Sequence, residues 1–447
     1  MSTTMKQTDD MLSIARSCIE IAKKGGATEA SAAAYRVRNV DFQWRDGKPE
    51  KVEESTTRGV QLAVFADQRY AVVSTSDLRR EALETFIGDA VDLAKSLAKD
   101  PFRSLPDPEL YKGQSTVDLG LEDPKYDTVT PELRQRIAKE AETAARAVKG
   151  NEAILSVTSN VSDTLTERFL VSSNGFAGKR RDTSFFVSAQ VSVKDKDGRR
   201  PEDYSYAGAR HFAEVPGGAV IGREAGERTI ARLGAKKGES AEMTMVIDNR
   251  ASGRMLGFLM GPLSGASIQQ KRSFLEGQLG KQVFSDKITI VDDPFIPKAF
   301  GSRLFDAEGI SAKTRPVVEA GVLKSYYIDS YYGRKLGVAP TSGSASNLRW
   351  TLGDKNRDAL VAGLQDGILV TSFLGGNSNG LTGDFSLGVQ GFRIRGGKLA
   401  EPVGEMNISG NHLVFWKQLA AVGNDPFPYS ALRTPTLVFD GVSFAGV

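Results

Sequence analysis

Hydrophobic and polar residues alternate along several stretches of the first half of the chain, as they do in strands with one buried face. In residues 59–66, for example, Val60, Leu62 and Val64 fall on one face. Asp46-Gly47, at the end of an earlier alternating stretch, has the composition of a hairpin turn. The alternation predicts strands at 31–45, 59–66, 70–74, 153–159, 164–173 and 183–194.

Apolar residues at helical spacing interrupt these strands. Met11, Ile14, Cys18 and Ile21 form one stripe, which ends at Gly25-Gly26. A helix is also expected from Asp77 to about Lys99, and another at about 219–233. Thr130-Pro131-Glu132 opens a further helix in the order cap, proline, acid. Because strands and helices do not alternate regularly, we expect an α+β domain built on antiparallel sheet.

The second half of the chain is predicted to be richer in strands. Residues 243–247 form a strand, and a helical stretch follows from about Ala251. Many of the 46 glycines lie after residue 250, which favours short strands and tight loops. Further strands are predicted at 287–292, 314–319, 322–329, 367–373, 384–395 and 435–440, with helical pattern at 357–364 and 411–421. We therefore expect an N-terminal α+β domain over 1–238 and a C-terminal β-rich, barrel-like domain over 239–447.

Composition narrows the class of protein. The 447 residues suggest two or three domains. A net charge of +3 is too small to predict nucleic-acid binding, and Lys179-Arg180-Arg181 is expected to be a solvated turn. The one cysteine, Cys18, excludes an intrachain disulfide and is expected to be a buried apolar residue. With no signal peptide and no apolar stretch of membrane-spanning length, the chain is expected to be cytoplasmic.

The common catalytic motifs are missing from the sequence. His211 and His412 are the only histidines, and neither has a second histidine nearby, as an H-E-x-x-H metal site would require. We expect His211 at a sheet edge or on the surface, and His412 at the start of a helix. No G-x-S-x-G elbow or P-loop occurs. The chain is therefore not expected to build a metal-dependent or histidine-dependent active site by itself.

The segment 374–391 is the most unusual in composition. Its glycines, including Gly375 and Gly376, let the backbone approach another chain closely. It is either a long structural hairpin or a loop that binds extended peptide through backbone hydrogen bonds. The short polar side chains that it offers are those of Asn377, Ser378, Asn379, Thr382, Asp384 and Ser386.

Several motifs in this half resemble a known family. GGNSNGLTGDFSLGVQGF, EPVGEMNISGN and AVGND, with RDGKPEKVEESTTRGVQLAVFADQRY and STSDL near the N-terminus, resemble the PmbA/TldE branch of the TldD/PmbA family. The resemblance runs from about residue 11 to 447. It implies a bacterial cytoplasmic complex in which TldD is a zinc metallopeptidase with an HExxxH helix. PmbA/TldE is implied to be its partner, with a similar fold and no metal site.

The chain departs from the TldD pattern at the catalytic helix, which here reads RASGRMLGFLMGPLSG. Gly257 and Phe258 stand where the first histidine and the glutamate would be, and Pro262 replaces the second histidine. None of these residues can bind zinc or act as a general base. We therefore expect no catalytic residue, no metal ligand and no cofactor in this chain, with zinc only in a TldD-type partner.

Three functional hypotheses follow. The first is a non-catalytic subunit of a TldD/TldE-type heterodimeric metalloprotease, which closes a chamber and holds unfolded or ribosomally made peptides. The second is a hydrolase without metal, using a Ser, Thr or Asp of 377–386, although the sequence shows no adjacent base. The third is a stand-alone peptide-binding or regulatory protein, including a modulator of DNA gyrase, which could form a homodimer. No membrane or direct nucleic-acid partner is expected.

Overall fold

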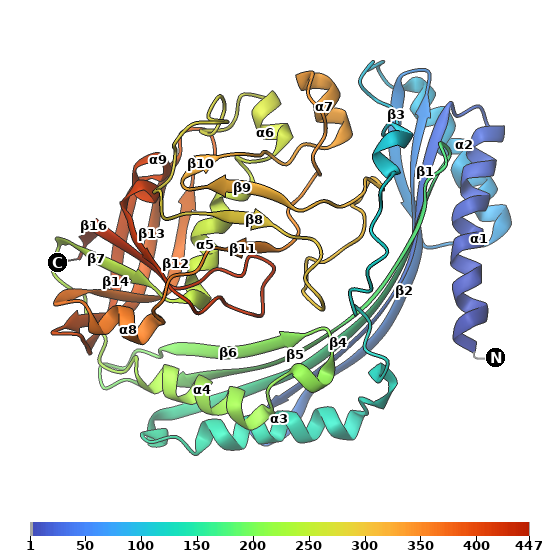
Figure 1. Ribbon diagram of the computed structural model, residues 1–447. Helices are drawn as coiled ribbons and strands as arrows, with labels where there is room; N and C mark the ends of the chain where they lie inside the picture. The colour runs from blue at the N-terminus through green and yellow to red at the C-terminus, as the bar shows by residue number, and fades with distance from the viewer. Residues whose placement is uncertain (1–2, 447) are drawn as a thin grey trace.

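The computed structural model describes residues 3–446, and side chains from residue 11 onward. A long antiparallel sheet of six strands curves around one side of a second, more compact part of the molecule (Figure 1). Its order is β3-β2-β1-β4-β5-β6. The strands are β1 (Glu29–Arg45), β2 (Lys48–Ala66), β3 (Arg69–Thr75), β4 (Ile154–Ser172), β5 (Ala177–Val193) and β6 (Glu202–Ala209).

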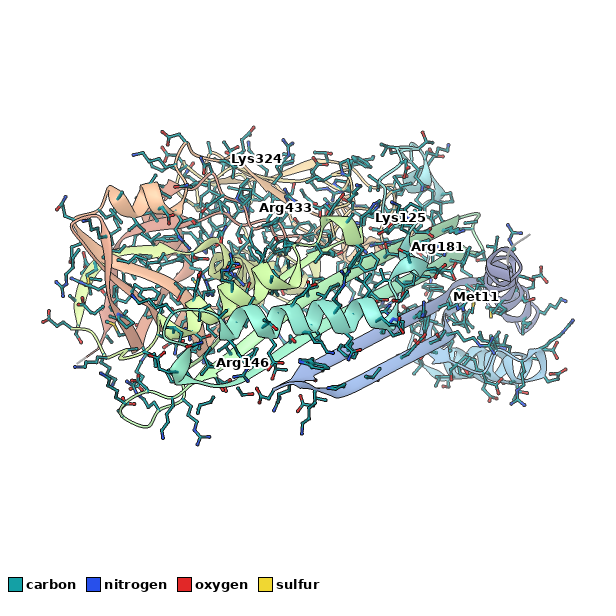
Figure 2. All side chains as sticks on the ribbon, turned by 90° about the horizontal axis from the view of Figure 1, so that it is seen from below. Met11, Lys125, Arg146, Arg181, Lys324 and Arg433 are labelled. Atoms are coloured by element: carbon teal, nitrogen blue, oxygen red, sulfur yellow. The ribbon has the colours of Figure 1, made fainter. Side chains whose placement is uncertain are left out.

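Two pairs of helices cover the convex face of this sheet (Figure 1). α1 (Thr3–Lys24) and α2 (Arg80–Ser96) pack at one end, over a core that includes Cys18. α3 (Pro131–Arg146) and α4 (Gly218–Ile230) pack toward the other end, over a second core. Viewed from below, α3 lies lengthwise along the strands (Figure 2). No helix among residues 3–446 is both long and apolar enough to cross a membrane.

The second part of the molecule is built on a closed barrel of five strands. The neighbours β12 and β7 run parallel, and the barrel closes where β14 pairs with β16 at Asn407↔Ala445 and Ile408↔Phe444. β15 (Leu419–Val422) extends the sheet beyond β16. The barrel strands are β7 (Ala241–Ile247), β12 (Asp366–Ser378), β13 (Asp384–Arg395), β14 (Lys398–Asn411) and β16 (Leu437–Ala445).

A smaller antiparallel sheet and several short helices complete this part. The sheet has the order β10-β9-β8-β11 and shares one hydrophobic core with the barrel. Its strands are β8 (Ile290–Asp292), β9 (Arg315–Glu319), β10 (Val322–Leu323) and β11 (Leu348–Trp350). The helices are α5 (Asn249–Met260), α6 (Gly265–Gln269), α7 (Ser330–Leu336), α8 (Arg357–Ala362) and α9 (His412–Phe415).

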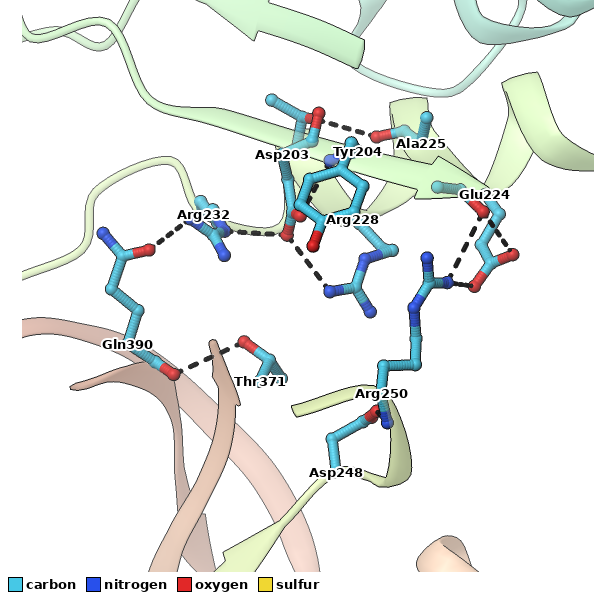
Figure 3. Close-up of polar contacts among 12 residues, drawn as sticks. Asp203, Tyr204, Glu224, Ala225, Arg228, Arg232, Asp248, Arg250, Thr371 and Gln390 are labelled. Carbon is cyan, nitrogen blue, oxygen red and sulfur yellow. Dashed lines mark hydrogen bonds and ion pairs between the residues drawn. The ribbon is translucent and has the colours of Figure 1, made fainter. Parts of the chain in front are cut away.

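A network of charged side chains joins the curved sheet to the barrel (Figure 3). The Arg232 guanidinium pairs with Asp203 of β6 at 2.9 Å and also donates to the Gln390 side chain of β13. Arg250, in the first turn of α5, pairs with Glu224 of α4. These contacts fix the start of α5 against the N-terminal part of the molecule.

The predicted fold class is confirmed: the protein is α+β, with an antiparallel N-terminal sheet and a barrel in the C-terminal half. The predicted burial of Cys18 is also confirmed, and burial raises the pKa of its thiol to about 11. Thr130 caps α3 as expected, because its hydroxyl accepts a hydrogen bond from the Leu133 amide at 3.3 Å. The boundary at residue 238 stays a prediction.

Several local predictions were wrong. Lys179-Arg180-Arg181 is not a turn but lies within β5, where pairing with β4 overrides the polar composition. The two strands predicted at 153–159 and 164–173 are the single strand β4. The helical pattern at 411–421 gives only the short α9 and a 3₁₀ turn at Trp416–Gln418, after which the chain enters β15. The polar strand β14 was missed, because its outward positions conceal the alternation.

Candidate functional site

The candidate site begins with helix α5, which follows β7 directly. Asp248 caps the helix by accepting a hydrogen bond from the Arg250 amide at 3.0 Å. Met255, Leu256 and Leu259 are buried against the barrel core. The opposite face of the helix is therefore left for Arg254 and Gly257, which are both exposed.

Gly257 and Phe258 lie on this helix, and Pro262 lies just after it. They are the three positions where the family resemblance places the metal-binding motif of TldD. Gly257 is exposed and has open space where a side chain would begin. Phe258 is half-buried against the core. Pro262 is buried two residues beyond the helix end, and its carbonyl accepts a hydrogen bond from the Ser273 hydroxyl at 2.7 Å.

These residues do not fit a zinc ion. Zinc in proteins takes thiolate, imidazole and carboxylate ligands, and the side chains of Gly257, Phe258 and Pro262 offer no such atom. Within the described part of the chain, no group of three or more His, Cys, Asp and Glu side chains is placed to hold a metal. No catalytic step through a metal is therefore derived for this chain.

His412 lies beside Phe258 and is fully buried. As expected, it opens a helix, because Asn411 is the cap of α9 and His412 its first residue. Its ring stacks on Phe274, with centroids 5.4 Å apart, and contacts Phe385 at 4.9 Å. This apolar surrounding disfavours the charged form and lowers the pKa of His412 to about 4. The imidazole is therefore neutral at pH 7.

Among the described residues, the His412 ring makes one hydrogen bond, and it joins the ring to the hairpin between β12 and β13. Its Nε2 lies 2.9 Å from the Ser378 hydroxyl, while Nδ1 is buried without a hydrogen-bond partner among the described residues. The two residues are 34 positions apart, and the antiparallel pairing of β12, β13 and β14 brings them together. Sequence reasoning missed this contact because the intervening strand β14 was not recognised.

The unusual Gly-rich segment forms the exposed end of this β12–β13 hairpin. Gly375 and Gly376 have positive φ angles of 50° and 82° at a bulge, where a side chain would be strained. The register resumes with Asn377↔Ser386 and Ser378↔Phe385. Of the residues predicted to bind peptide, Ser378 is half-buried, and the others are exposed: Gly375, Gly376, Asn377, Asn379, Asp384 and Ser386.

The hairpin end lies over α5. The Arg254 guanidinium donates to the Gly375 carbonyl at 2.7 Å, and a side chain added at Gly380 would reach within 3.7 Å of Pro262. Asp384 is tied into the turn by Asn411, and these hydrogen bonds lower the pKa of its carboxyl group. The structure thus brings α5, the hairpin and His412 into one region.

One edge of β12 is open beside this region. β12 pairs with β7 only from Ile368 to Val370, because β7 ends at Ile247 and the chain turns into α5. Within residues 3–446, no strand pairs with Thr371–Ser378 on that side. A backbone edge of this kind can accept an added strand.

Comparison with known proteins identifies the family. Three family models match in order: PmbA/TldA metallopeptidase domain 1 at residues 30–94, the central domain at 124–233, and the C-terminal domain at 240–446. A crystal structure from Bacteroides thetaiotaomicron, of a candidate modulator of DNA gyrase, is 39% identical with a TM-score of 0.94, covering 97% of this chain and 98% of that one. The chain belongs to the PmbA/TldE branch of the PmbA/TldD family. It is thus a metalloprotease-like protein of that family.

More distant members agree with this assignment. Metalloprotease PmbA of Escherichia coli O157:H7 is 26% identical, over 94% of this chain and 93% of that protein. The solved structure of TldE from Thermococcus kodakarensis is 19% identical with a TM-score of 0.84, covering 97% of this chain and 100% of that one. At that identity the likeness shows the fold alone, and the two structures share their fold over 97% of this chain.

Proposed function

We propose that this PmbA/TldE-family protein is the non-catalytic subunit of a heterodimeric TldD/TldE-type metalloprotease. In this complex, which we place in the cytoplasm, a TldD-type partner supplies the zinc and the chemistry. This chain closes part of the chamber and holds an unfolded or ribosomally made peptide in extended form. It contributes no catalytic residue and no cofactor.

The observation that supports this proposal most is the state of α5. The helix keeps its cap, its buried face and its place beside the barrel, while Gly257, Phe258 and Pro262 offer no metal-ligand atom. His412, the nearest imidazole, is stacked among phenylalanines and bonded to Ser378. The helix thus keeps its place in the fold but offers no atom that could bind a metal. This fits a subunit that retains a peptidase architecture while its partner carries out the reaction.

The open edge of β12 supports the peptide-holding role. An extended peptide can pair with the backbone of Thr371–Ser378, which gives affinity without demanding a particular sequence. Gly375 and Gly376 leave room at the bulge for the close approach of another chain. The neighbouring guanidinium of Arg254 is exposed and already fixes the Gly375 carbonyl.

The proposal is tested by measuring cleavage of a flexible, fluorogenic peptide by the chain alone, by a TldD-type partner encoded in the same genome, and by their mixture. We expect cleavage by the mixture, inhibited by chelator, and none by this chain alone. The control is a partner in which the glutamate of the HExxxH helix is replaced by Gln. The mixture made with this variant should cleave no peptide. Metal-dependent cleavage by this chain alone would overturn the proposal.

The hydrogen bond between Ser378 and His412 favours a second candidate, a serine hydrolase, because it supplies the base that the sequence did not show. Against it, the buried Nδ1 has no partner to orient the ring among residues 11–446, and the low pKa makes His412 a weak base. Activity of the isolated chain in excess chelator, lost in Ser378→Ala, would establish this candidate. Absence of any such activity would eliminate it.

A further inference from the structure

A cleft of about 700 Å³ lies away from α5, between the curved sheet and the C-terminal half. One wall is the connector 117–124, which runs between the two parts of the molecule (Figure 1). The second wall is the beginning of β5 at 179–181, and the third is the segment 303–305. The basic run that was expected to be a solvated turn thus lines a cleft.

The connector wall is held firmly in place. The carbonyls of Leu119, Gly120 and Leu121 accept hydrogen bonds from the Lys298 amide, the His211 Nε2 and the Thr183 amide, at 2.8, 2.9 and 3.0 Å. On the opposite side, the half-buried Arg303 donates to the Ser342 hydroxyl at 3.2 Å. Because its walls are fixed, the cleft is already formed before any ligand enters.

The β5 wall presents an unpaired strand edge. β6 pairs with β5 only between Phe185 and Ser192. The Thr183 amide points to this same edge, where it meets Leu121. Because backbone groups alternate along a strand, the amides of Arg181 and Lys179 also point to it. In the part of the chain that the structure describes, no strand pairs with Lys179–Arg181 on this side.

The lining carries more cationic than acidic side chains. The lining includes two carboxylates, those of Asp118 and Glu122. It also includes four cationic side chains, those of Lys179, Arg180, Arg181 and Arg303. Arg181 pairs with Glu122 at 3.0 Å, and Arg180 pairs with Asp182 at 2.8 Å. The exposed Lys179 ammonium lies over the Phe169 ring at 5.6 Å and has no carboxylate within ion-pair distance among residues 11–446.

We propose that this cleft binds an extended acidic peptide segment, which pairs with the open edge of β5 and places successive carboxylates on the two faces of the sheet, one at Lys179 and the next at Arg180. A strand edge gives the backbone its partners, and the basic side chains select acidic residues. At ~3.3 Å per residue, the open edge accommodates roughly four residues of an added strand. This site is separate from the β12 hairpin and requires neither a metal nor a partner subunit.

The proposal is tested by fluorescence anisotropy with the purified full chain and labelled eight-residue peptides. One peptide carries four consecutive Glu between Thr residues, so that carboxylates lie on both faces of the added strand. A second replaces every Glu by Gln, and a third carries N-methyl groups along one edge of the acidic peptide. We expect the acidic peptide to bind at least 10-fold more tightly than the Gln peptide. The N-methylated peptide should lose most of that affinity, because it cannot pair with β5.

Variants locate the binding. Lys179→Glu combined with Arg180→Glu should weaken binding of the acidic peptide at least 10-fold, and the milder Lys179→Gln should weaken it measurably with the fold intact. The matched control is Lys149→Glu with Lys237→Glu, two exposed lysines outside the cleft lining, which makes the same change in net charge. The proposal is overturned if both double variants lose affinity equally, if neither does, or if the acidic and Gln peptides bind alike. None of these results depends on whether a metallopeptidase partner exists.

Discussion

At the scale of single residues, the contact between His412 and Ser378 connects the hairpin to the core beside α5. The imidazole is fully buried among aromatic rings, and Ser378 is its one hydrogen-bond partner among the described residues. The sequence does not predict the contact between Ser378 and His412. Taken alone, Ser378 is a typical loop residue and His412 a typical residue at the start of a helix. The histidine beside α5 is therefore neutral at pH 7 and buried in the protein interior.

The low pKa of His412 makes stability depend on pH. The unfolded chain binds a proton at this residue below about pH 6.5, while the folded chain does so only below about pH 4. The contribution of His412 to the free energy of unfolding should therefore be constant above pH 6.5 and fall as the pH drops toward 4, by up to about 3 kcal/mol. His412→Phe should reduce this pH dependence in urea unfolding curves. An unchanged pH dependence in the variant would show that His412 does not titrate as its burial requires.

Removing the Ser378 hydroxyl should destabilise the protein. Ser378→Ala leaves the buried Nε2 of His412 without its partner, which costs about 1–3 kcal/mol. Ser386→Ala is the matched control, because Ser386 is exposed on the adjacent strand and should change stability by no more than about 0.5 kcal/mol. Thermal unfolding of the two variants gives the comparison. Equal midpoints would contradict a structural role for the hydroxyl group.

At the scale of elements, glycines set how closely α4 approaches α3. Gly218, Gly222 and Gly226 recur every four residues along α4 and face the backbone of α3. A methyl group at Gly222 would lie 1.9 Å from the Ala141 carbonyl oxygen. The helices can therefore pack together only if α4 has no side chain on this face.

Gly222→Ala should accordingly destabilise the N-terminal domain by about 1–3 kcal/mol, because the helices must move apart. Gly88→Ala in α2 is the matched control. Its added methyl group meets nothing within 4 Å, and alanine favours a helix by roughly 0.5–1 kcal/mol over glycine. Chemical unfolding should therefore give shifts of opposite sign for the two variants. A stabilising effect of Gly222→Ala would disprove the close helix contact.

The elements also show what sequence alone could predict. Long alternating strands and capped helices, such as β1 and α3, follow from periodicity and local signals. Lys179–Arg181 were missed because three consecutive basic residues conceal the alternation of a strand, although β5 follows β4 directly across the turn at 173–176. The position of Phe258 beside His412 depends instead on the closure of the barrel.

At the scale of the whole molecule, the Arg250–Glu224 pair ties the first turn of α5 to α4, a helix that covers the curved sheet (Figure 3). The retained architecture and the absence of ligand atoms at Gly257, Phe258 and Pro262 are the basis for assigning catalysis to a partner. The open edges of β12 and β5 lie in different parts of the same chain. We infer that its role in the proposed complex is to hold polypeptide.

The most direct test of this account is the metal content of the chain, measured by native mass spectrometry alone and together with a TldD-type partner. The account predicts that the isolated chain binds no metal. It also predicts that all zinc in the complex is bound by the partner. Replacement of the partner's HExxxH histidines should then leave the complex without zinc. One zinc ion per chain on the isolated protein would contradict the central claim.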